Sequence, residues 1–65
     1  MNPLEERIRR IQWIIKICKE SSNEEYVLAQ IGIVHGISRR TAVEYINQLV
    51  TAGKLERDGP NVRTT

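Results

Sequence analysis

Apolar residues recur every three or four positions near the start of the chain, which is the period of an amphipathic helix. Asn2 supplies a capping side chain, Pro3 suits the first helical position, and Glu5 follows three residues after the cap. We therefore predict a first helix over about residues 3–20. Its predicted core-facing stripe consists of Leu4, Ile8, Ile11, Ile15 and Cys18, with Ile14 and Ile17 on one flank.

A second helix is predicted over about residues 23–35. Ser21 with Glu24, or Ser22 with Glu25, has the spacing of a capping box, and Gly36 has the place of a helix stop. Apolar residues lie almost all round this segment, so we expect it to be the most buried helix of the chain. They are Tyr26, Val27, Leu28, Ala29, Ile31, Val34 and Ile37.

A third helix is predicted over about residues 38–52, because Ser38 is a favourable N-cap and Gly53 can end the helix. Its apolar side consists of Ala42, Tyr45, Ile46, Leu49 and Val50.

The last dozen residues differ in kind from the helices. Residues 54–57 alternate between polar and apolar, residues 58–61 are turn formers, and residues 62–65 are β-prone. This pattern predicts a small hairpin over about 54–65. We therefore expect one mainly α domain over residues 1–65, with three helices and a β-hairpin.

Composition narrows the possible classes of protein. A chain of 65 residues with 40% hydrophobic content has room for one small core, and such a core is marginal. With one cysteine, Cys18, and one histidine, His35, it lacks the residues for an intrachain disulfide or a structural zinc site. No apolar run reaches the length of a membrane span, and the start of the chain does not resemble a signal peptide. We expect a cytoplasmic protein without metal or cofactor.

The charge is small but unevenly distributed. The net charge is +2, and residues 1–37 carry equal numbers of basic and acidic side chains. The whole excess lies in residues 38–65, where an anion-binding surface is therefore expected.

The spacing of Gly32 and Gly36 matches a helix-turn-helix, in which a small residue allows a close helix crossing and a glycine four positions later makes the turn. Further along, Thr41, Ala42, Ile46, Leu49, Gly53 and Gly59 stand at matching offsets. With these residues, positions 24–65 resemble the winged helix-turn-helix transcription regulators. Two positions depart from that pattern: Gly32 stands where the family more often has alanine, and Lys54 where it usually has an apolar residue.

The predicted third helix offers the candidate contacts to double-stranded DNA. Arg39 and Arg40 lie in its first turn, and either can bind guanine O6 and N7 or a phosphate. Helical geometry places Val43, Glu44 and Asn47 with them, away from the apolar side. The full set on this helix is Ser38, Arg39, Arg40, Thr41, Val43, Glu44, Asn47 and Gln48, and the resemblance adds Lys54, Arg57 and Arg63 in the wing. Glu24 and Glu25 count against binding, because they bring negative charge to the second helix.

A second surface is suggested by the first helix. Trp13 lies off the predicted stripe with Ile14 and Ile17 beside it, so these three residues are candidates for a homodimer interface. The alternative function is a winged-helix module that binds another protein through the same surface, since a fold does not determine a function. We find no nucleophile with a base, no paired carboxylates and no phosphate-binding loop, and an enzyme is not expected.

Overall fold

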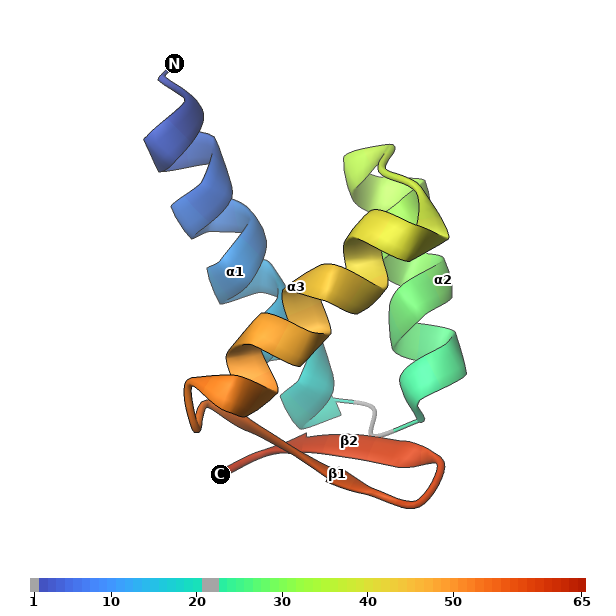
Figure 1. Cartoon of the computed structure of the whole chain (residues 1–65). Helices are drawn as coiled ribbons and strands as arrows, with labels where there is room; N and C mark the ends of the chain where they lie inside the picture. Colours follow the sequence, from blue (N-terminus) through green and yellow to red (C-terminus); the bar gives the residue numbers. More distant parts are fainter. Residues whose placement is uncertain (1, 21–22) are drawn as a thin grey trace.

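The computed structural model describes residues 2–20 and 23–65 of the chain. In it, helices α1 (Pro3–Glu20), α2 (Glu24–His35) and α3 (Arg39–Thr51) precede an antiparallel hairpin of β1 (Leu55–Asp58) and β2 (Asn61–Thr64). In Figure 1, α3 crosses in front of the other two helices and the hairpin lies below all three. The predicted three-helix and hairpin layout of a winged helix is confirmed.

Local signals in the sequence explain where the helices begin. The Glu5 amide donates to Asn2 Oδ1 at 2.8 Å, and the Thr41 amide donates to Ser38 Oγ at 3.2 Å. Asn23 caps α2, accepting from the Tyr26 amide at 3.0 Å. The serine caps predicted for this helix, at positions 21 and 22, lie outside the described residues.

Gly36 makes the turn between α2 and α3. Its φ of 65° is left-handed, and its amide donates to the Gly32 carbonyl at 3.0 Å. Glycine adopts this conformation without the steric penalty that other residues incur. The predicted helix stop at Gly36 is confirmed.

Every element contributes to one hydrophobic core. Ile14 of α1, Ile31 of α2 and Ile46 of α3 are fully buried, and Leu55 and Val62 of the hairpin join them with at most 2% of their surface exposed. These branched side chains from all five elements hold the three helices and the hairpin together.

The buried side of α1 matches the predicted face only in part, through Cys18 of the stripe and its flanking Ile14 and Ile17. Ile14, Ile17 and Cys18 are buried, whereas Leu4 is 65% exposed and Ile8 is 45% exposed. At 100° per residue, the observed buried side lies about 90° round the helix from the predicted stripe. The residues buried on α1 all belong to its second half, because the other elements pack there and leave the first turns uncovered.

Helix α2 is also less buried than expected. Val27, Leu28 and Ile31 face the core, but Tyr26 is 49% exposed and Val34 is 53% exposed. Helix α2 still has the smallest share of exposed residues of the three helices, so the prediction of the most buried helix is confirmed, whereas burial of its apolar residues all round is not.

The hairpin is fixed to α2 through its turn. The Glu24 amide donates to the Pro60 carbonyl at 3.1 Å, and Asn23 forms an isolated antiparallel bridge with Asn61. These backbone contacts place the wing beside the first turn of α2.

Candidate nucleic-acid interface

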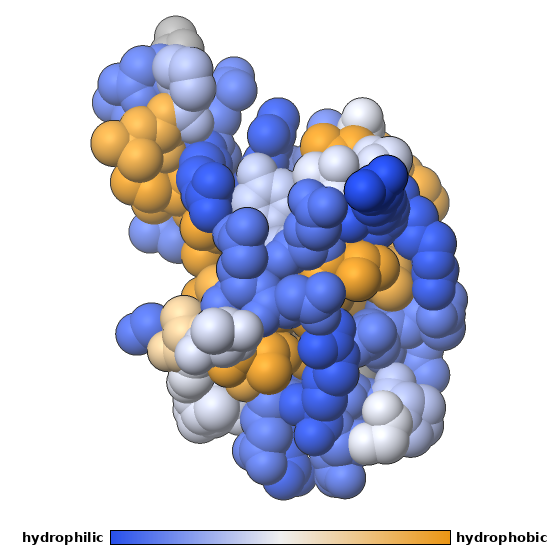
Figure 2. All heavy atoms as spheres, viewed as in Figure 1, coloured by the Kyte–Doolittle hydropathy of each residue, from blue (hydrophilic) through white to orange (hydrophobic). Residues whose placement is uncertain are grey.

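The outer face of α3 is polar and charged. Arg40, Glu44 and Asn47 are exposed along it, opposite the buried Ala42 and Ile46. A band of hydrophilic side chains follows α3 across the face seen in Figure 2. This arrangement confirms that one side of α3 packs into the core and leaves the other side open to a partner.

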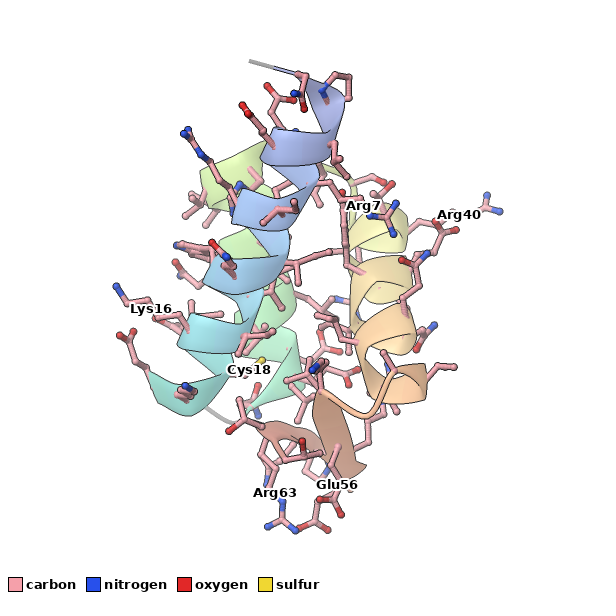
Figure 3. The ribbon with its side chains drawn as sticks, turned by 90° about the vertical axis from the view of Figure 1, so that its left-hand side faces the viewer. Arg7, Lys16, Cys18, Arg40, Glu56 and Arg63 are labelled. Carbon is pink, nitrogen blue, oxygen red and sulfur yellow. The ribbon has the colours of Figure 1, made fainter. Side chains whose placement is uncertain are left out.

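Arg40 is the most accessible cation of this face. Its side chain is 91% exposed and points away from α3 into solvent (Figure 3). The Nε atom of Arg40 lies 3.9 Å from a carboxylate oxygen of Glu44, a distance at the limit of an ion pair. Such an exposed contact is weak, so the guanidinium can reach an external anion at little cost.

Val43 is more buried than predicted. Sequence geometry placed it on the free face, but its side chain is half-buried and packs against the hydrophobic core. Val43 therefore lies at the edge of the free face, because α3 is covered over a wider arc than its fully buried residues indicate, and its contact with DNA stays a prediction.

Arg39 is held by a carboxylate of the protein itself. Its Nη1 and Nη2 atoms donate to the two carboxylate oxygens of Glu25 at 2.8 Å and 2.6 Å. This hydrogen-bonded pair lowers the pKa of Glu25 and raises the pKa of Arg39 above its ordinary value. The carboxylate occupies the same donor pair that a phosphate or a guanine edge would use.

The wing cations also have acidic neighbours. Arg57 Nε donates to Glu24 Oε1 at 2.8 Å, and this pair is more buried than the others, with side-chain exposures of 36% and 24%. Arg63 lies 3.7 Å from Glu56 and 3.9 Å from Asp58, on the same hairpin (Figure 3). The Arg57 pair thus joins the wing to α2, which gives Arg57 a structural role.

Two other predicted residues occupy different positions. Lys54 is exposed between α3 and β1, and it makes no ion pair within residues 2–20 and 23–65. Thr41 is half-buried, and its hydroxyl accepts a hydrogen bond from Ser38 Oγ at 3.1 Å. Lys54 is therefore the more available of the two for a phosphate.

The structure adds Arg7, which sequence reasoning missed. Arg7 of α1 donates from Nη2 to Gln48 Oε1 at 2.7 Å, and its guanidinium carbon lies 5.8 Å from the centre of the Tyr45 ring. Together with Thr41 and Glu44, these residues line a shallow hollow of about 140 Å³. Arg7 and Gln48 are 41 positions apart, so no local pattern in the sequence links them.

The predicted dimer surface around Trp13 is largely internal. Ile14 is fully buried and Ile17 is 9% exposed, so both belong to the core of the single chain and their assignment to a dimer interface is wrong. Trp13 is half-buried, and its ring meets His35 edge-on with the ring centres 4.8 Å apart. Trp13 therefore joins α1 to the end of α2.

His35 and Cys18 are structural side chains in this arrangement. Burial, and secondarily the charge of Arg10, lowers the pKa of His35, whose Nε2 is buried without a hydrogen-bond partner in the described part of the chain. Burial, and secondarily the charge of Glu24, raises the pKa of Cys18 to about 11. A thiol with this pKa stays protonated and is a poor nucleophile or metal ligand at neutral pH.

The described ranges, 2–20 and 23–65, contain neither a metal-binding cluster nor a membrane-spanning helix. No group of three or more His, Cys, Asp or Glu side chains there is placed to hold a metal ion. No helix in those ranges has both the length and the apolar character required to cross a membrane.

Comparison of the chain with protein-family models, with curated proteins and with solved structures gave no match.

Proposed function

We propose that this protein binds double-stranded DNA, with the outer face of α3 in the major groove and the hairpin against the sugar–phosphate backbone, as a small regulator of transcription. The observation that carries the proposal is the outer face of α3, which is open, polar and led by the exposed Arg40 in its first turn. A major groove about 12 Å wide admits one α-helix, and arginine at a helix start is suited to guanine or phosphate.

The start of α3 adds a second favourable feature. Ser38 accepts from the Thr41 amide, while the amides of Arg39 and Arg40 precede the first hydrogen-bonded turn and point out of the helix end. Amides at a helix N-terminus, together with the helix dipole, favour a phosphate.

Because Arg39 is paired with Glu25, the two arginines differ in how readily they can contact DNA. Arg40 is available to DNA as it stands, whereas Arg39 becomes available only when an anion replaces the Glu25 carboxylate. We therefore assign the main contact to Arg40. The backbone contacts of the wing are assigned first to Lys54 and Arg63, which are both exposed.

The test is fluorescence anisotropy of a labelled generic DNA duplex over a series of salt concentrations. The wild type is compared with Arg40→Ala and with Arg9→Ala, which removes the same charge from an exposed position on α1. Binding should weaken with log salt at a slope of about −0.9 per phosphate contact, and Arg40→Ala should reduce that slope by about one contact per chain.

Arg9→Ala should leave the slope close to that of the wild type. Absence of binding at low salt would reject the proposal. Equal weakening by Arg40→Ala and Arg9→Ala would also reject it, because the effect would then reflect net charge and not the face of α3.

A further inference from the structure

Arg7 lies on the side of α1 that faces the body of the molecule. It stands seven positions before the fully buried Ile14, so the two residues share a side of the helix, about two turns apart. Arg7 itself is exposed, because the core does not reach the first turns of α1, and its side chain is directed towards α3 (Figure 3). A cation of α1 is therefore presented beside α3.

Neutral groups hold the Arg7 guanidinium in place. Its Nη2 atom donates to Gln48 Oε1 at 2.7 Å, and its central carbon lies 5.8 Å from the centre of the Tyr45 ring. An amide oxygen and an aromatic ring orient a guanidinium without cancelling its charge. Within residues 2–20 and 23–65, no carboxylate pairs with Arg7, and its Nε and Nη1 atoms have no acceptor. Its charge and most of its donors are thus available to an external anion.

Arg7 and Glu25 lie on opposite sides of α3. Gln48, which holds Arg7, stands nine positions after Arg39, which is held by Glu25. Nine positions are two and a half turns of a helix, so the two contacts are half a turn apart around α3, with its outer face between them. The α1 side of α3 therefore carries an unpaired arginine, whereas the α2 side carries an arginine already paired with a carboxylate.

The other charges near Arg7 leave the α1 side of α3 positive. Among the described residues, Glu44 is the one acidic residue that lines the hollow beside Arg7, and Arg40 Nε lies 3.9 Å from its carboxylate. On α1, Glu5 precedes Arg7 by two positions and so faces the opposite way, and Glu6 lines a separate hollow near the end of α2. Two arginines thus adjoin one carboxylate, and the excess charge favours an anion.

We propose that Arg7 binds a backbone phosphate of the DNA strand that runs along the α1 side of α3. This inference rests on the proposed function, since it requires α3 to lie in the major groove. A groove about 12 Å wide is filled by one helix about 10–12 Å across, so the phosphates of the two strands run along the two sides of the helix. Arg7 offers its guanidinium fork to one strand, and Gln48 is the positioning residue that holds the fork in place.

Fluorescence anisotropy over a salt series tests Arg7 separately from Arg40. Arg7→Ala should lower the slope against log salt by about 0.9, so that the affinity gained between 200 and 50 mM salt is about three- to fourfold smaller than for the wild type. Arg7→Lys keeps the charge without the fork, so it should keep the slope and bind more weakly at every salt concentration. Arg9→Ala is the matched control, because it removes an exposed arginine from another side of α1 and should leave the slope unchanged.

Equal slopes for Arg7→Ala and Arg9→Ala would overturn the inference. If Arg40→Ala still lowers the slope in that case, the proposed function stands and only the contact of Arg7 is rejected. Absence of binding by the wild type at low salt would overturn both proposals. Circular dichroism verifies that the helices are retained in each variant, which is expected because the substituted side chains are exposed.

The NMR signal of the Arg7 side-chain Nε–H group gives a readout that a purely structural arginine would not move. It should shift when a DNA duplex is added, and inorganic phosphate at the same phosphate concentration and ionic strength should leave it unchanged, because a free ion lacks the other contacts of the duplex. No shift with DNA would overturn the contact. An equal shift with inorganic phosphate would also overturn it, since the hollow would then bind a small anion.

Double substitution tests the role of Gln48. Gln48→Ala should weaken DNA binding without changing the slope, because Arg7 keeps its charge but loses its hydrogen-bond partner. In the Arg7→Ala background, Gln48→Ala should cause no further loss of affinity. A further loss in that background would show that Gln48 contacts DNA by itself and would overturn its role in positioning Arg7.

Discussion

Helices α1 and α3 both bury one side in the same core, but their exposed sides differ in chemistry. Helix α3 exposes Arg40, Glu44 and Asn47, whereas the first half of α1 exposes Leu4 and Ile8. A charged face gains from contact with an anion such as DNA, and an apolar face gains from removal of its surface from water. The comparison therefore separates two exposed surfaces of different chemistry on a chain of 65 residues.

The largest expected effect concerns the two halves of α1. Ile14→Ala removes a fully buried side chain and should lower the free energy of unfolding by about 2–5 kcal/mol. Ile8→Ala, on the same helix, should change it by less than about 0.5 kcal/mol, because the Ile8 side chain is 45% exposed. Urea denaturation followed by circular dichroism measures both. Similar losses for the two variants would mean that the first half of α1 is covered within the monomer.

The next effect concerns Cys18, on the buried side of α1. Its pKa is raised to about 11 in the folded chain from an ordinary value of 9.0, so the unfolded chain loses its proton first as the pH rises. The protonated thiol of Cys18 favours the folded chain fully below pH 9, and this stabilisation is lost as the pH approaches 11. Over that interval the wild type should lose about 2–3 kcal/mol relative to Cys18→Ala. Parallel pH profiles of the two proteins would contradict the burial of the thiol.

A smaller effect distinguishes the two glycines that position α3. Gly36→Ala should cost about 1–2 kcal/mol, because alanine disfavours the φ of 65° found there. Gly32→Ala should instead stabilise the chain by about 0.5–1 kcal/mol, since the added carbon would lie 3.5 Å from the Ile37 carbonyl, an ordinary contact. Thermal unfolding of both variants measures the difference. Destabilisation by Gly32→Ala would show that the two helices cross more closely than described.

The smallest effect concerns the charge that Glu25 brings to α3. Glu25→Gln removes the carboxylate that holds Arg39 and leaves the outer face of α3 intact. We expect tighter DNA binding at low salt and an increase of about one contact in the slope against log salt. Glu20→Gln is the control, because it removes an exposed carboxylate at the far end of α1. An unchanged slope in Glu25→Gln would show that Arg39 takes no part in DNA binding.

Sequence reasoning succeeded where the determinants are local. The caps at Asn2 and Ser38, the stop at Gly36 and the division of α3 into two faces all depend on residues a few positions apart. The hairpin was predicted for the same reason, from its turn formers and the β-prone residues after them.

Sequence reasoning failed where an element's neighbours decide the outcome. Periodicity shows which residues of α1 share a side, but not which side meets the core or how much of the helix the body covers. Leu4 and Ile8 were therefore predicted as buried and are exposed. The contacts of Arg39 with Glu25 and of Arg7 with Gln48 depend on how the helices cross, which no spacing in the sequence encodes.

The central claim is that the outer face of α3 binds DNA, and titration of the isotopically labelled protein with a DNA duplex, followed by backbone amide NMR, tests it most directly. We predict that the largest shift changes fall on residues 38–48 and on the hairpin near Lys54 and Arg63, while Leu4 and Ile8 change little. Shift changes concentrated on the first turns of α1, or no changes at low salt, would contradict the claim.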